Sequence, residues 1–192
     1  MVMKKSILSI CLCVLTQTMA SAMTVEEAYK AIPHRYTPFE AGSASMTSQE
    51  SRFLADFFGL VNLAIVERVQ TLAWFQSRGK QGSPVSNYRK NVERIIANLG
   101  QLNVPKNCAA VRQRVVEAIQ DQKTYFQEWE NAQTAASPFK GALGSAGPRH
   151  ALVTTSSQKL HQAYSELVRQ FPKESAKNQQ AFFDHLCALD FI

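Results

Sequence analysis

The fold is decided by residues 53–66, which read FLADFFGLVNLAIV. Apart from Asp56, Gly59 and Asn62, every residue in this stretch is apolar. A helix that is apolar all round is either buried in a bundle or spans a membrane. The interior Asp56, and the charged residues that follow at 67 and 68, argue against a membrane, where a charge near the bilayer centre costs about 2.5–3.5 kcal/mol. We therefore expect a long buried central helix in an antiparallel bundle.

Local start and stop signals predict further helices on both sides of this stretch. Capping boxes begin at Thr24 and Thr47, where a threonine precedes a glutamate by three residues. Prolines and glycines punctuate the segments between helices, and no segment alternates as a strand does. The resulting prediction is an all-α bundle of about five to six helices in a single domain, residues 23–192. The predicted helices cover about 24–32, 47–77, 83–99, 105–135, 150–171 and 174–189.

The first 22 residues read as a secretory signal peptide. Lys4 and Lys5 precede a mostly apolar run at 6–16, and Ala20-Ser21-Ala22 supplies the small residues of a cleavage site. The apolar run is too short to span a bilayer. We expect cleavage after Ala22 and a periplasmic mature protein, with secretion as the alternative destination. A retained anchor or an N-terminal core helix is the competing interpretation.

The charge of the chain excludes one class of partner. Without the two lysines of the signal, 19 basic residues face 15 acidic ones, a formal charge of +4. The densest basic cluster, at 78–94, is interrupted by Glu93 and lacks the interleaved aromatic residues that stack on bases. We therefore expect no nucleic-acid partner and no transmembrane segment in the mature chain.

Two cysteines remain after cleavage, Cys108 and Cys187. An even pair in an oxidising compartment predicts one disulfide, which would stabilise the fold by about 4–5 kcal/mol in the chain-entropy model. The pairing has a geometric condition. In a strict up-and-down bundle the helices that carry these residues run the same way, with one cysteine at a helix start and the other at a helix end. The last helix must therefore fold across the bundle, or the loop at 137–148 must carry the chain back, or the pairing is wrong.

The usual metal and cofactor motifs are missing. The chain contains no C-x-x-C-H sequence for haem attachment and no Glu-x-x-His pair of the kind that holds two irons. We expect no metal and no cofactor. Ser157 and His161 are four residues apart on a helix, which permits a nucleophile–base contact, but no acid occupies the next position of that face. The sequence therefore indicates no catalytic residues.

The segment 33–40, PHRYTPFE, is the most distinctive part of the chain outside the helices. It could bind a ligand together with a polar helix face, or it could be a strap that packs its two aromatic residues on the bundle. We expect Asn62 to satisfy a buried hydrogen bond and Asp184-His185 to lie on the surface. The candidate ligand-binding residues are His34, Arg35, Tyr36 and His161.

These patterns favour a non-catalytic binding or adaptor protein whose partner is an unknown envelope protein or a small ligand. One alternative is a small-molecule-binding bundle, which requires the 33–40 segment and the His161 face to converge on one pocket. Another is an enzyme with an unfamiliar site. The oligomeric state does not follow from the sequence.

Overall fold

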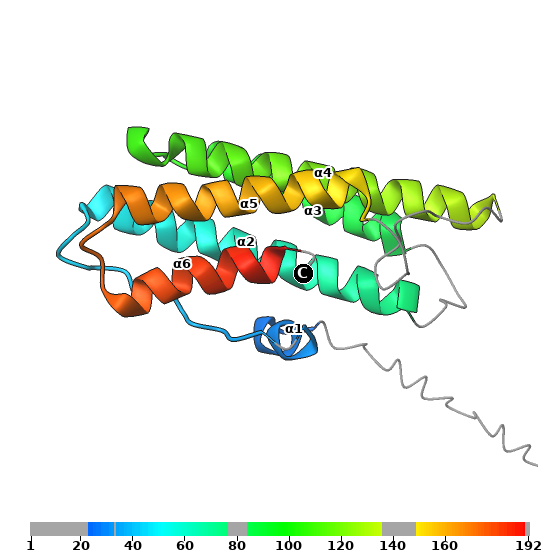
Figure 1. The fold of residues 1–192 in the computed structure, drawn as a ribbon, viewed down its shortest axis with the longest axis horizontal. Helices are drawn as coiled ribbons and strands as arrows, with labels where there is room; N and C mark the ends of the chain where they lie inside the picture. Colours follow the sequence, from blue (N-terminus) through cyan, green and yellow to red (C-terminus); the bar gives the residue numbers. More distant parts are fainter. Residues whose placement is uncertain (1–22, 33, 77–83, 136–148, 191–192) are drawn as a thin grey trace, which may run out of the picture.

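The computed structural model describes residues 23–32, 34–76, 84–135 and 149–190, and every regular element within them is helical (Figure 1). The predicted all-α bundle is confirmed. The signal segment, Pro33 and the loop at 136–148 lie outside the described residues. The elements are α1 (Val25–Ala31), α2 (Ser48–Gln76), α3 (Pro84–Gln101), the short 3-10 helix η1 (Lys106–Cys108), α4 (Ala109–Thr134), α5 (Ala151–Gln170) and α6 (Ala176–Leu189).

Both capping boxes begin helices where the sequence places them. The Thr24 amide donates to the Glu27 carboxylate at 2.7 Å, and the Glu27 amide donates to Oγ1 of Thr24 at 3.2 Å. Thr47 and Glu50 make the same reciprocal pair at the start of α2, at 2.7 and 3.2 Å. These bonds satisfy amides that have no partner within the helix, so the two helix starts are locally determined.

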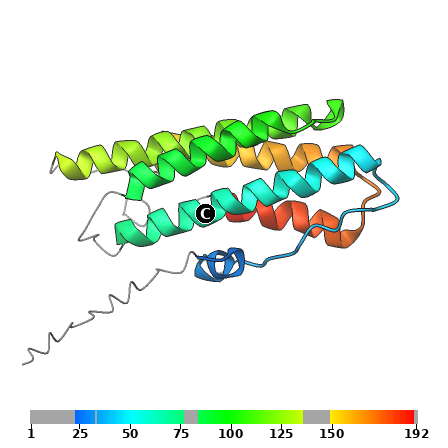
Figure 2. The same ribbon diagram turned by 180° about the vertical axis from the view of Figure 1, so that it is seen from behind.

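Each long helix packs against the next one along the chain, and α6 also returns to α2 (Figures 1 and 2). Helix α1 lies across α2. The core is continuous, and α2 supplies a large part of it, as its apolar sequence predicts. The buried apolar side chains of α2 are Phe53, Leu54, Phe57, Phe58, Val61, Ala64, Ile65, Val66, Val69 and Phe75.

One narrow face of α2 is nevertheless exposed. Leu63 on this face is 50% exposed, and a Cβ built on Gly59, one turn earlier, would meet nothing within 4 Å. A glycine inside a helix destabilises it by about 1 kcal/mol relative to alanine. The interior of this molecule therefore has no need of a glycine at position 59.

Helix α6 is held at both ends by side chains from distant parts of the chain. Asn178 near its start accepts from the Glu40 amide at 2.8 Å and donates to the Glu40 carbonyl at 2.9 Å. At its other end, Nε2 of Gln122 donates to the Leu189 carbonyl at 2.8 Å, and the buried Arg68 donates to the Ala188 carbonyl. The last carbonyls of α6 thus accept hydrogen bonds although the helix ends inside the bundle.

The predicted disulfide between Cys108 and Cys187 is wrong, because both thiols are unpaired. Asn107, beside Cys108, bonds to Glu50 in the first turn of α2. Helix α6 begins at that same end of the bundle and runs in the direction of α4 (Figure 1). Cys187 therefore lies eleven residues along α6, roughly 16 Å from its start. A disulfide needs Cα atoms within about 7 Å, and α6 does not fold back across the bundle to bring Cys187 to Cys108.

Candidate functional site

The 33–40 segment packs two aromatic residues on the bundle. The Tyr36 ring lies 4.9 Å from that of Tyr29 and 5.7 Å from that of His185. The Phe39 ring lies 5.6 Å from that of Phe58 on α2 and also stacks on α6. The strap interpretation is therefore confirmed for Tyr36 and Phe39. The same packing places the described part of this segment, residues 34–40, beside α6.

His34 and Arg35 of this strap differ in their exposure. The His34 amide donates to the Tyr29 carbonyl at 3.0 Å, and its half-buried ring faces Phe183 at a centroid distance of 6.4 Å. Arg35 is exposed. Of the three candidates from this segment, His34 therefore reaches the exposed side of α6, Tyr36 serves packing, and Arg35 points to solvent.

Phe183 joins the two predicted regions. Its side chain is exposed, at 41%, and its ring meets that of Tyr164 on α5 edge to face at 5.6 Å. His34 approaches Phe183 from the strap, whereas His161 approaches from α5. We name the depression on the α5 side the Phe183 hollow, which is lined by Leu160, His161, Tyr164, Phe183, Leu186 and Cys187. The strap and the His161 face thus converge on one residue, although His34 and Tyr36 do not line the hollow.

The Phe183 hollow is small. Its volume is about 40 Å³, which corresponds to roughly three water molecules. Sites that bury a drug-sized ligand usually enclose about 300–1,000 Å³. The hollow is therefore suited to one apolar side chain of a partner and is too small to surround a free ligand.

Asp190, just after α6, supplies the acid that the sequence of α5 lacks. Oγ of Ser157 donates to Oδ2 of Asp190 at 2.7 Å, and Nε2 of His161 lies 3.6 Å from the same oxygen. The carboxylate thus stands between the hydroxyl and the imidazole. A nucleophilic serine must give its proton to the base, whereas Ser157 donates to the acid, so these three residues do not form a catalytic triad.

The expectation that Asp184-His185 lies on the surface is wrong, because each residue is 1% exposed. Nδ1 of His185 lies 2.7 Å from the Ala181 carbonyl, to which only a protonated ring nitrogen can donate. Burial lowers the pKa of His185 and so favours the neutral ring. Nε2 of Gln180 donates to Oδ1 of Asp184 at 2.6 Å. The sequence signal for this burial is the four-residue spacing of Ala181 and His185, which places His185 on the same face of α6 as the buried Ala181.

Asn62 behaves as predicted. Its Oδ1 accepts a hydrogen bond from the hydroxyl of Tyr29 at 3.1 Å, and both residues are buried. Burial raises the pKa of Tyr29, so the phenol keeps its proton and donates. This bond connects α1 to α2 beneath the strap.

Cys187 lines the Phe183 hollow, and its thiol is a poor nucleophile. Burial raises the pKa of its thiol, and the Asp190 and Asp184 carboxylates act in the same direction. Within the described ranges, no group of three or more His, Cys, Asp or Glu side chains is arranged to hold a metal ion. The described helices also include none that is long and apolar enough to cross a membrane.

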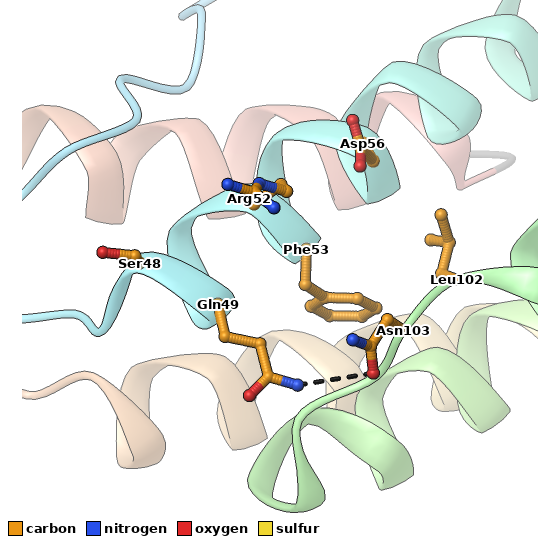
Figure 3. A pocket seen from close by; sticks show the side chains of 7 residues that line it. All are labelled: Ser48, Gln49, Arg52, Phe53, Asp56, Leu102 and Asn103. Atoms are coloured by element: carbon orange, nitrogen blue, oxygen red, sulfur yellow. Dashed lines mark hydrogen bonds between the residues drawn. The ribbon is translucent and has the colours of Figure 1, made fainter.

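Two larger depressions lie on the opposite side of the molecule, between α2 and α3, the helices nearest the viewer in Figure 2. The first has a volume of about 180 Å³ and lies between the start of α2 and the residues that follow α3 (Figure 3). Phe53 lies within it, and Gln49 bonds to Asn103 across it at 3.4 Å. The second, of about 460 Å³, continues along α2 past Gly59.

Comparisons with protein family models, with curated proteins and with solved structures found no significant match to this chain.

Proposed function

We propose that this chain is a non-catalytic binding protein that is exported to the periplasm and contacts a protein partner at the Phe183 hollow. The observation that carries the proposal is the exposed Phe183 ring, held between His34 and Tyr164. A large aromatic residue that is exposed yet fixed in place loses little entropy on binding, and such residues dominate binding energy at interfaces.

The size of the hollow supports one of the two binding hypotheses over the other. At about 40 Å³ it admits a single aliphatic side chain and leaves most of a free ligand in water. This favours an adaptor with a protein partner over a small-molecule carrier. The contact of Ser157 with Asp190 instead of His161 supports a non-catalytic role.

The sharpest test places a photo-crosslinking amino acid at Phe183 in living cells, with the matched control at Gln120, an exposed residue on α4. We expect a protein adduct from position 183 and none from position 120. The captured partner is then purified, and its affinity is measured for the original chain and for Phe183→Ala. We expect Phe183→Ala to weaken binding at least tenfold, with an unchanged circular dichroism spectrum.

Three outcomes would overturn this proposal. These are equal adducts at both positions, an adduct of small-molecule mass, and an affinity that Phe183→Ala leaves unchanged. Export is tested separately by fractionation and by the N-terminal sequence of the periplasmic product, which we expect to begin at Met23.

A further inference from the structure

We infer that the partner binds through an acidic segment, which places one apolar side chain in the Phe183 hollow and a carboxylate, about three or four residues away, on Arg169. This inference rests on the proposed function and adds to it the chemistry of the partner. It is carried by the charges around the hollow and by the depression that continues from it.

The α5–α6 hairpin, residues 149–190, exposes basic charges and no acidic ones. Its exposed charged side chains are Arg149, Arg169, Lys173 and Lys177. Every carboxylate in the same stretch is buried or half-buried and accepts a hydrogen bond from within the chain; these are Glu166, Glu174, Asp184 and Asp190. A partner that covers this hairpin therefore meets cations whose charge no exposed acid of the hairpin offsets.

The strap adds a cation on the other side of Phe183. Arg35 is exposed and follows His34, whose ring faces Phe183 at 6.4 Å. The one acid of the strap, Glu40, is exposed but pairs with Nζ of Lys177 on α6. The surface around Phe183 is therefore positive, and electrostatic complementarity selects an acidic partner.

A second depression continues from the Phe183 hollow across α5, and His161 lines both. Its volume is about 400 Å³, and Arg114 of α4 and Glu166 and Arg169 of α5 contribute its charges. Nε of Arg114 donates to Glu166 at 2.8 Å, and the other oxygen of that carboxylate is shielded from solvent. Arg169 makes no hydrogen bond or ion pair within the described residues. Arg169 is thus the cation of this depression that is free to bind an anion.

The distance between the two features sets a spacing in the partner. His161, at the edge of the hollow, precedes Arg169 by eight residues, roughly 12 Å along the axis of α5. An extended segment rises about 3.3 Å per residue, so about three or four residues cover this distance. The hollow, at about 40 Å³, admits one aliphatic side chain. A concave site with a fixed spacing favours a protein segment over the flat surface of an anionic membrane.

The experiment selects peptides that bind the purified protein from a display library of short random sequences, with counter-selection on Phe183→Ala. We expect enrichment of peptides that carry one apolar residue and an Asp or Glu about three or four positions from it. The affinity of a selected peptide is then measured by fluorescence anisotropy, which uses the labelled peptide itself as the probe.

Charge reversal provides the specific control. Arg169→Glu should weaken binding of the selected peptide about fivefold or more, and a peptide with lysine in place of its acid should regain affinity for this variant. Lys90→Glu makes the same kind of charge change at an exposed residue of α3, away from the hairpin, and should alter the affinity less than about twofold. Circular dichroism verifies that each variant folds.

The possible failures are distinguishable. Peptides that need Phe183 but carry no acid, or equal losses for Arg169→Glu and Lys90→Glu, would overturn the acidic partner and leave the contact at Phe183 standing. If no selected peptide distinguishes Phe183→Ala from the original chain, the proposed function fails as well. Sedimentation with phosphatidylglycerol vesicles that requires Phe183 and Arg169, without enrichment of acidic peptides, would overturn the inference in favour of a membrane surface.

Discussion

Replacing Gly59 with alanine is expected to raise the free energy of unfolding by about 0.5–1 kcal/mol. Gly59 lies inside α2, far from either helix end, so it carries the full conformational entropy penalty of a helical glycine. The added methyl group would meet nothing within 4 Å, so neither a packing gain nor a clash alters this value. The whole effect is therefore the difference in helix propensity.

The assay is urea denaturation followed by circular dichroism. The matched control is Ala55→Gly, one turn earlier on the same exposed face, which should lower the free energy of unfolding by a similar amount. In thermal unfolding the two variants should move the midpoint in opposite directions by about 1–4 °C.

The reasoning is refuted if Gly59→Ala destabilises the protein, or if Ala55→Gly has no effect while Gly59→Ala does. Either result would show that position 59 has a structural role inside the monomer.

Three further predictions concern other parts of the molecule. Burial lowers the pKa of the His185 ring in the folded protein below its value in the unfolded chain. As the pH falls below about 6.5, the unfolded chain therefore binds a proton at His185 more readily than the folded protein does, and the free energy of unfolding should decline. His185→Gln should reduce this decline, as measured by urea titrations at about pH 5 and 7.5. Peptide mapping after alkylation of the denatured, unreduced protein should find Cys108 and Cys187 both modified. Protection of both thiols from alkylation would instead show that they form a disulfide. Thr47→Ala should lower the free energy of unfolding by about 1 kcal/mol, because the N-cap of α2 is lost, whereas Thr47→Ser should keep the capping bond and most of the stability. Equal losses for the two variants in chemical denaturation would contradict this role of Thr47.

Part of the candidate site could be foreseen and part could not. The segment at 33–40 and the helix face of His161 stand out by composition, and both do border Phe183. Phe183 itself does not stand out, because an aromatic residue in an apolar helix reads as core until its neighbours are known. Its exposure is a property of how α5, α6 and the strap surround it.

Local sequence by itself determined the helices and most of their ends, because capping bonds such as Thr47 to Glu50 and the breaks at proline and glycine act within a few residues. It also determined that residues 53–66 are largely buried. These features depend on hydrogen bonds and periodicity that are complete within one helix.

Only the tertiary structure decided where α6 lies. Its position depends on bonds between residues far apart in the chain, such as Asn178 with Glu40 and Gln122 with Leu189. That position separates the two cysteines, buries His185 and brings Asp190 to Ser157. No periodicity within a single helix encodes these outcomes, because each is the result of which buried faces best fill one another when the whole chain packs.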